Sequence, residues 1–432
     1  MKMLKVCTLW LFCAILTANA FAADRPNIVI ILADDQGYGD ASYHEHPDDI
    51  NTPQIDRLAA AGVRMTNGYA SAYVCAPTRA GLLTGRYQQR FGFYRAGDSR
   101  VGLPVSEITI ADVLQKEGYA TGVFGKWHLG LEPPFYPQAR GFDEFYGFLG
   151  HGGHDYFDLS YKPDEPHSAI RRNDAILGNE TGYLTDNLAR EASAFIDSHK
   201  DEPFFLYLPF NAVHFPMHAP EEDIKRFNTG DKNRDILLAM LYRMDIGIGR
   251  VLDALESAGV ADNTLIFYFS DNGGAKNNSA NNLPLRDYKH SVYEGGLRVP
   301  FVVSWPGTLK PGNNDEPVIC LDIFPTICAA GGVDLPGDRV YDGRDMLPAL
   351  RGESNKPLHD ALYWDGYDGP WAMREGDWKL IYTKQKKLEL YNLAADLGEK
   401  NNLADADPAR VKNMERKFHA WRDPLPPSIG KK

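Results

Sequence analysis

Short runs dominated by apolar residues constrain the fold of this chain more than any other sequence feature. Runs of this length are typical of strands that are buried on both faces of a sheet. Four of them lie at Asn27 to Leu32, Tyr119 to Phe124, Phe204 to Leu208 and Thr264 to Phe269. Segments with helical periodicity separate them, so we predict an α/β fold with a large mixed, mostly parallel sheet sandwiched by helices.

The helices between these runs have recognisable ends. Thr52 followed by Pro53 is a typical helix start. A second helix is predicted over Thr109 to Glu117. The longest, roughly Arg234 to Ala258, carries apolar residues at every third or fourth position, which gives one buried stripe. In a sheet of this kind, ligands bind beyond the carboxyl ends of the strands.

The pattern changes near residue 340. Short strand-like pieces follow at 361–364, 378–382 and 388–391, and a final helix is predicted near 408–421. We therefore predict a main domain over residues 23–340, which carries the candidate catalytic residues described below, and a smaller C-terminal α+β subdomain over residues 341–432.

Residues 1–22 have the pattern of a cleaved secretory signal peptide. Lys2 and Lys5 precede an apolar run from Val6 to Thr17, and small residues follow at positions 18, 20 and 22. A membrane anchor needs about 20 apolar residues, and this run is shorter. We expect an exported protein, periplasmic or secreted, with no membrane span.

The charge balance bears on possible partners. Lysine and arginine total 46 against 58 aspartate and glutamate residues, which gives a formal net charge of −12. Nucleic-acid-binding proteins need basic surface to neutralise phosphates, so no nucleic-acid partner is expected. An acidic chain can still bind an anion in one basic pocket, because the local field decides that interaction.

The chain has five cysteines, and only one of them invites a chemical role. Cys7 and Cys13 lie within the predicted signal peptide. Cys320 and Cys328 flank a predicted helix start, where the two sulfurs would lie too far apart for an unstrained bridge, so we favour core packing over a disulfide. Cys75 is left as a single thiol in an exported protein.

Two acidic pairs follow predicted strands: Asp34 with Asp35 after the first, and Asp271 with Asn272 after the last. Adjacent carboxylates repel each other unless a cation neutralises them. Carboxylate and amide oxygens are the ligands that Ca²⁺ and Mg²⁺ prefer. One such pair alone would be an ordinary solvated turn, but two that can meet at one sheet edge indicate a metal site.

The segment around Cys75 is predicted to start a short helix. Pro77 suits an early helix position, and Gly85 suits the end of the helix. Cys75 would then lie at the helix N-terminus, where the dipole favours an anionic nucleophile. Arg79 lies one turn further on the same face and could hold the nucleophile or its product as a forked donor. A buried cysteine before an ordinary helix is the alternative.

Several motifs, taken in order, resemble those of the type I sulfatases, in which a cysteine is oxidised to Cα-formylglycine. The similarity extends from about residue 25 to the Asn402-Leu403 region, and Thr78 stands where serine is commoner. The motifs are Asp34-Asp35, CAPTR with LTGR at 75–86, GKWHLG at 125–130, NAVHFP at 211–216, SDNG at 270–273 and K…EGGLRVP at 289–300.

This resemblance implies an alkaline-phosphatase-like fold and a site for Ca²⁺, with Mg²⁺ less favoured. The implied metal ligands are Asp34, Asp35, Cys75, Asp271 and Asn272. Zinc-dependent relatives usually place histidines in the metal site, whereas an asparagine follows Asp271 here. Oxidation of Cys75 implies a formylglycine-generating maturation enzyme as a partner.

The resemblance also implies roles for the catalytic side chains. Cys75, as a hydrated aldehyde, would offer a gem-diol; one hydroxyl attacks sulfur and expels the alcohol. His128 would deprotonate the second hydroxyl, which releases sulfate. Lys126 and Lys289 would neutralise the sulfate oxygens, and His214 would protonate or polarise the leaving oxygen. The alternatives are structural histidines and surface lysines.

Substrate contacts are predicted in the loop over residues 151–180, because a long loop in a compact domain is usually functional. The candidates are His151, His154, Arg171 and Arg172, with ordinary loop polarity as the alternative. Aromatic residues of the C-terminal subdomain could stack on a sugar ring or pack between the two domains. These are Trp364, Tyr367 and Trp371.

The favoured function is therefore an exported sulfatase that acts on a sulfated carbohydrate. One alternative is a phosphomonoester or phosphonate-ester hydrolase of the same superfamily. The other is a non-catalytic protein that binds sulfated glycans, which predicts loss of the nucleophile, the metal ligands or Arg79, and all of these are present.

Overall fold

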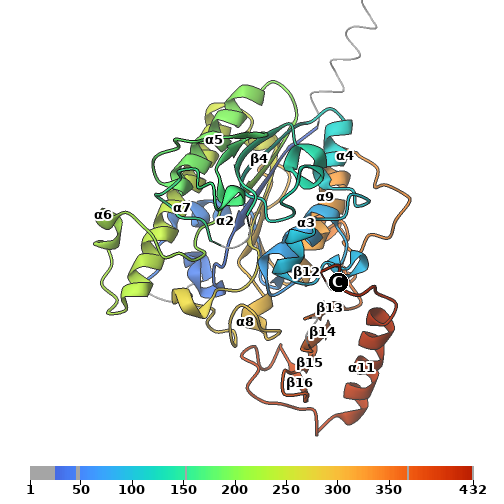
Figure 1. Ribbon diagram of the computed structural model, residues 1–432. Helices are drawn as coiled ribbons and strands as arrows, with labels where there is room; N and C mark the ends of the chain where they lie inside the picture. Colours follow the sequence, from blue (N-terminus) through green and yellow to red (C-terminus); the bar gives the residue numbers. More distant parts are fainter. Residues whose placement is uncertain (1–24, 45–48, 151–152, 367–368, 431–432) are drawn as a thin grey trace, which may run out of the picture.

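The computed structural model describes residues 25–44, 49–150, 153–366 and 369–430. The predicted signal peptide lies outside the described residues, as do His151 and Tyr367. The described chain forms a large sheet flanked by helices, with a smaller unit of four strands and one helix at the C-terminal end (Figure 1). Among the helices of this part of the chain, none has the length and apolarity needed to cross a bilayer.

The main sheet has ten strands in the order β11-β2-β10-β9-β1-β8-β4-β5-β6-β7. The central strands β9, β1, β8, β4 and β5 run parallel, and β10 pairs with β9 antiparallel. The predicted mixed, mostly parallel sheet is thus confirmed. The strands are β1 (Asn27–Ala33), β2 (Val63–Met65), β4 (Ala120–Lys126), β5 (Glu144–Phe148), β6 (Arg171–Arg172), β7 (Ala175–Ile176), β8 (Phe204–Pro209), β9 (Thr264–Ser270), β10 (Phe301–Ser304) and β11 (Gly312–Asn314).

Helices cover both faces of this sheet (Figure 1). Side chains of β1 alternate between two cores: Ile30 packs in the core with α3, α4 and α9, and Ile31 packs in the core with α2, α5 and α7. This two-sided burial explains the apolar sequence of the central strands. The helices are α2 (Pro53–Ala61), α3 (Cys75–Thr84), α4 (Ile110–Lys116), α5 (Leu184–His199), α7 (Lys232–Ser257) and α9 (Ile323–Gly331).

Shorter elements complete this unit. A two-stranded sheet pairs β3 (Gly68–Tyr69) with β12 (Val318–Ile319). The short helices are α6 (Glu221–Ile224), α8 (Glu294–Leu297) and α10 (Leu347–Leu350). Cys320 and Cys328 are both buried and both free, which confirms the expected core packing.

The C-terminal unit is an antiparallel sheet covered by one helix. Its elements are β13 (Leu362–Asp365), β14 (Trp371–Glu375), β15 (Trp378–Tyr382), β16 (Leu388–Asn392) and α11 (Pro408–Arg422). The sequence indicated every element except β14. Trp371, in this strand, stacks on Phe418 of α11 with ring centroids 3.9 Å apart. Burial of Trp371 in this small core leaves it unavailable as a sugar platform.

Trp364 joins the two units. Its side chain is 1% exposed, its ring lies 5.1 Å from that of Tyr69, and its Nε1 donates a hydrogen bond to the carbonyl of Ala70 at 2.8 Å. The alternative of packing between the domains is therefore the one that the structure shows for Trp364.

A buried ionic network also crosses this interface. Lys379 of β15 lies 2.8 Å from Glu294 at the start of α8 and 3.0 Å from Glu399, and all three side chains are fully buried. Burial raises the pKa of Glu399 to about 7. Burial acts in the same direction on Glu294, but the charges of Lys379 and Arg298 outweigh it and lower the pKa of that carboxyl to about 2.

Candidate active site

The two acidic pairs meet at the carboxyl ends of β1 and β9, as the sequence predicted. Strand pairing places Ala33 opposite Ser270, so the residues that follow these positions emerge side by side. Asn272 donates a hydrogen bond from Nδ2 to Oδ1 of Asp35 at 2.8 Å. Asp34, Asp35, Asp271 and Asn272 are all buried.

Helix α3 brings Cys75 to the same place. The helix begins at Cys75 and ends at Thr84, and Gly85 caps it with a φ of 64°, in the left-handed region that glycine tolerates. The Sγ atom of Cys75 and carboxylate oxygens of Asp34 and Asp271 all lie within 4.8 Å of one another. Burial raises the pKa of the Cys75 thiol, so this cysteine has no built-in thiolate character.

Arg79 is buried and bonded to the metal-ligand candidates. Its Nε and Nη2 atoms donate to Oδ2 of Asp271 at 3.0 and 2.8 Å, and Nη1 donates to the carbonyl of Lys126 at 2.9 Å. Nη2 lies 3.4 Å from Asp34. The guanidinium has no exposed surface, so it orients the carboxylates of Asp34 and Asp271 from the buried side of the cluster.

Two lysines approach the carboxylates from β4 and from the segment before α8. Lys126, the last residue of β4, places Nζ 2.5 Å from Asp34, and Lys289 places Nζ 2.6 Å from Asp35. Burial opposes ionisation of both carboxyls, but the charge of Lys126 keeps the pKa of Asp34 low and the charge of Lys289 does the same for Asp35. The neighbouring cations thus hold both carboxyls ionised.

The two candidate histidines lie at the same sheet edge. His214, beyond β8, places Nε2 3.6 Å from Asp35, while its Nδ1 lies 2.7 Å from the carbonyl of Phe215. Burial lowers the pKa of His214, which favours the neutral imidazole at neutral pH. His128 is buried two residues beyond Lys126, with a φ of 61°.

The residues at this edge fit a hard divalent cation. Within the described chain, Oδ1 of Asp34 and Oδ1 of Asn272 are buried without a hydrogen-bond partner, and such oxygens are costly unless a ligand satisfies them. Burial and the nearby charge of Asp34 raise the pKa of Asp271 to about 7. A cation among these oxygens would relieve that repulsion.

The predicted substrate-binding residues that the structure describes in the loop over residues 151–180 contact neighbouring groups of the protein. His154 places its ring nitrogens 2.5 and 2.6 Å from the carbonyls of Asp155 and Ser168. Arg171 lies over the ring of Tyr136, and Arg172 forms an ion pair of 2.8 Å with Glu191. Their role in substrate binding stays a prediction.

The sequence did not reveal what supports the turn at Asp271 and Asn272. The amide of Gly273 donates to the carbonyl of Gly296 at 3.1 Å, and a Cβ at position 273 would lie 1.8 Å from the carbonyl oxygen of Gly295. This close approach packs the Asp271-Asn272 turn directly against α8. Since α8 begins at Glu294, the buried ionic network lies directly behind the site.

A buried cysteine at a helix start, beside a cluster of carboxylate and amide oxygens at the carboxyl edge of a mixed sheet, fits an ester hydrolase of the alkaline-phosphatase-like class. Two family models match the chain: Sulfatase over residues 26–333, and N-sulphoglucosamine sulphohydrolase, C-terminal, over residues 287–422. The chain belongs to the sulfatase family, and it is a sulfuric ester hydrolase.

Individual relatives match over most of their length. Arylsulfatase A of Bos taurus is 32% identical over 449 residues, which covers 92% of this chain and 87% of the relative. N-acetylgalactosamine-6-sulfatase of Mus musculus is 34% identical over 443 residues, covering 94% and 82%. The solved structure of Ps i-CgsB in complex with k-i-k-neocarrahexaose is 37% identical, with a TM-score of 0.86 and coverage of 92% and 93%.

Proposed function

We propose that this sulfatase removes sulfate from a sulfated carbohydrate, using a formylglycine made from Cys75 and a bound divalent cation, Ca²⁺ rather than Mg²⁺. One observation carries the proposal: Sγ of Cys75 shares a 4.8 Å cluster with carboxylate oxygens of Asp34 and Asp271 at the start of α3. That grouping puts a modified side chain at position 75 beside the proposed cation ligands.

Similarity to carbohydrate sulfatases supports the substrate class. The mouse relative is named for N-acetylgalactosamine, and Ps i-CgsB was solved with a neocarrahexaose. The signal-like pattern of residues 1–22 supports export to the periplasm or the medium, where such polymers occur. The oxidation of Cys75 requires a formylglycine-generating maturation enzyme in the producing cell.

We assign each side chain of the cluster a role that its position can support. A divalent cation held by Asp34, Asp35, Asp271, Asn272 and residue 75 would supply positive charge next to the reacting oxygens. As a hydrated aldehyde, residue 75 would supply one hydroxyl to attack sulfur and a second whose deprotonation releases sulfate. Arg79 fixes Asp271 by two hydrogen bonds and so keeps the cluster in place.

The two lysines would neutralise negative charge, and the two histidines would transfer protons. Lys126 and Lys289 place their ammonium groups against Asp34 and Asp35, where they can also neutralise sulfate oxygens. We assign His128 as the base for the second hydroxyl. His214 is the group that protonates or polarises the leaving oxygen; its side chain is 14% exposed, which leaves it open to the substrate side.

Mass analysis of the active protein tests this proposal. Trypsin cleavage after Arg64 and Arg79 releases one peptide that contains residue 75. We expect that peptide to show the mass change from CH₂SH to CHO, and fully active protein with an unmodified thiol would contradict the mechanism. Parallel rates on aryl sulfate and aryl phosphate separate this function from the phosphoester alternative, which predicts faster phosphate release.

Removal of the cation is expected to abolish turnover. Because three carboxylates converge in this site, chelation should lower the rate on an aryl sulfate by at least about 100-fold. Addition of Ca²⁺ or Mg²⁺ should restore the rate and raise the melting temperature of the chelated protein, since an ion that binds only the folded state stabilises it. Restoration by Zn²⁺ alone would refute the assigned donor set.

A further inference from the structure

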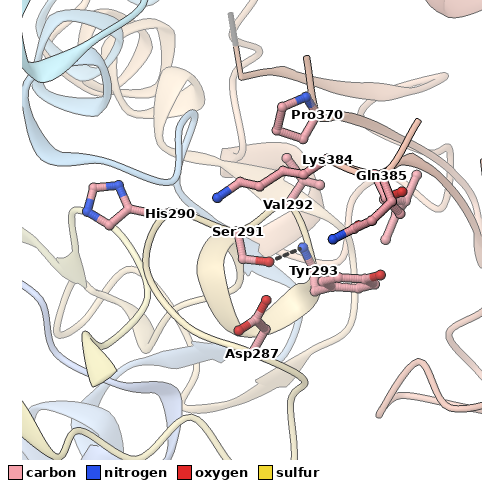
Figure 2. Close-up of a pocket in the computed structure, with 10 residues that line it drawn as sticks. Asp287, His290, Ser291, Val292, Tyr293, Pro370, Lys384 and Gln385 are labelled. Carbon is pink, nitrogen blue, oxygen red and sulfur yellow. Dashed lines mark hydrogen bonds between the residues drawn. The ribbon is translucent and has the colours of Figure 1, made fainter. Parts of the chain in front are cut away.

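A small cavity of about 130 Å³ lies between the two units of the protein (Figure 2). One wall comes from the segment Asp287–Tyr293, which leads into α8. The other wall comes from the C-terminal unit: Pro370, Ile381 and the turn Thr383–Gln385. The two family models overlap at residues 287–293, in the first wall. The wall from the C-terminal unit is covered only by the model over residues 287–422.

This cavity adjoins the proposed active site. His290, which lines the cavity, directly follows Lys289, whose Nζ lies 2.6 Å from Asp35. The amide of His290 donates to the carbonyl of Tyr73 at 3.1 Å, and Tyr73 lies two residues before Cys75. Because consecutive residues contribute to the active site and to the cavity wall, a sulfate at Lys289 and a group in the cavity are compatible with neighbouring sugars of one chain.

The wall from the C-terminal unit contributes one lysine, Lys384, to the cavity. The turn between β15 and β16 reads Thr-Lys-Gln-Lys-Lys from residue 383, in a protein whose net charge is −12. Figure 2 shows Lys384 extending across the cavity toward His290. Burial lowers the pKa of His290, and the charges of Lys289 and Lys384 act in the same direction. His290 is therefore a neutral hydrogen-bond donor beside the charge of Lys384 on this side of the cavity.

The rest of the lining suits a sugar rather than a bare anion. Asp287, Ser291 and Gln385 offer polar atoms for hydroxyl groups, and Figure 2 places Asp287 away from Lys384. Val292 and Ile381 are buried and supply apolar surface. The volume equals that of about four waters at roughly 30 Å³ each, which suits one charged substituent and part of its ring.

We propose that this cavity is a second substrate subsite, in which Lys384 and His290 bind an anionic substituent on the sugar next to the one that loses its sulfate. The inference rests on the proposed carbohydrate function and deepens it, since it specifies a substrate that carries at least two negative groups. A sulfate and a uronate carboxylate share the chemistry that these two side chains recognise.

The test compares Lys384→Gln with Lys387→Gln. Both substitutions remove one lysine charge from the same turn, but Lys387 is not among the described residues that line the cavity. Binding is measured by titration calorimetry in a Cys75→Ala background, so that it does not depend on turnover. The probes are matched oligosaccharides whose neighbouring sugar carries a second sulfate, a uronate carboxylate or no charge.

Lys384→Gln is expected to weaken binding of the doubly charged probes about tenfold, because it removes one charge-assisted hydrogen bond. Binding of the singly charged probe should change less, and Lys387→Gln should behave like the parent. The doubly charged probe that binds more tightly shows whether the subsite prefers a second sulfate or a uronate carboxylate. If Lys384→Gln weakened the binding of all three probes equally, or of none of them, the proposed subsite would be overturned. Failure of the proposed function shows separately, as absence of sulfate release from every probe by the unsubstituted protein.

Discussion

Cys75→Ala is expected to lower the turnover of sulfate esters by about 10⁴-fold or more, because it removes the side chain from which the nucleophile is made. The fold should persist, since Cys75 is a small buried side chain at a helix start and truncation there costs about 1–2 kcal/mol. Initial rates on 4-nitrophenyl sulfate and urea unfolding curves measure the two effects.

Cys328→Ala is the matched control for this substitution. Cys328 is also a free, buried cysteine, but it lies in α9 within the apolar core. Its replacement should reduce stability by a similar amount and leave the rate within about twofold of the parent, because it touches no part of the cluster. If Cys75→Ala retained more than about 1% of the parent rate, residue 75 could not be the nucleophile.

Lys379→Met is expected to destabilise the protein by about 3–5 kcal/mol at pH 8, because it leaves Glu399 buried without its cation and leaves Glu294 with Arg298 alone as an ion-pair partner among the described residues. Glu399 would then have a pKa still further above that of the unfolded chain, because Lys379 no longer opposes the effect of burial. The loss should therefore shrink as the pH falls toward 5, where protonation neutralises this carboxyl. Urea unfolding at both pH values provides the measurement.

Glu399→Gln removes an acid from the same network, so its stability relative to the parent should change with pH in the opposite direction. The pKa of Glu399 is raised to about 7, above its ordinary value of 4.5, so its stabilising contribution is lost as the pH rises from 4.5 to 7. The glutamine variant lacks this dependence. Its stability relative to the parent should rise between pH 5 and pH 8, and a constant difference would contradict the raised pKa of Glu399.

The convergence of the acidic pairs was predictable because it depends only on strand order and direction. Asp34 and Asp271 each follow a strand by one residue, and parallel neighbours place such residues at one edge. Strand β14 was not predicted, since its five residues (WAMRE) are bounded by the turn residues Pro370 and Gly376 and include none of the β-branched residues that favour a strand.

The partners of buried charges could not be read from the sequence. Lys379 stands between Trp378 and Leu380 in a strand, and nothing local indicates that a carboxylate 85 residues away neutralises it. The same is true of Arg79: its helix position was predictable, but its two hydrogen bonds to Asp271 span 192 residues. Such pairings arise only when distant elements pack.

The position of Glu294 has a consequence for anyone who recombines sulfatases. The family model over residues 287–422 includes Glu294 together with Lys379 and Glu399, although α8 packs on the Asp271-Asn272 turn of the main unit. A chimera spliced near residue 340 would receive Glu294 from one parent and both Lys379 and Glu399 from the other. Successful grafts should therefore be those that exchange residue 294 along with the C-terminal sheet.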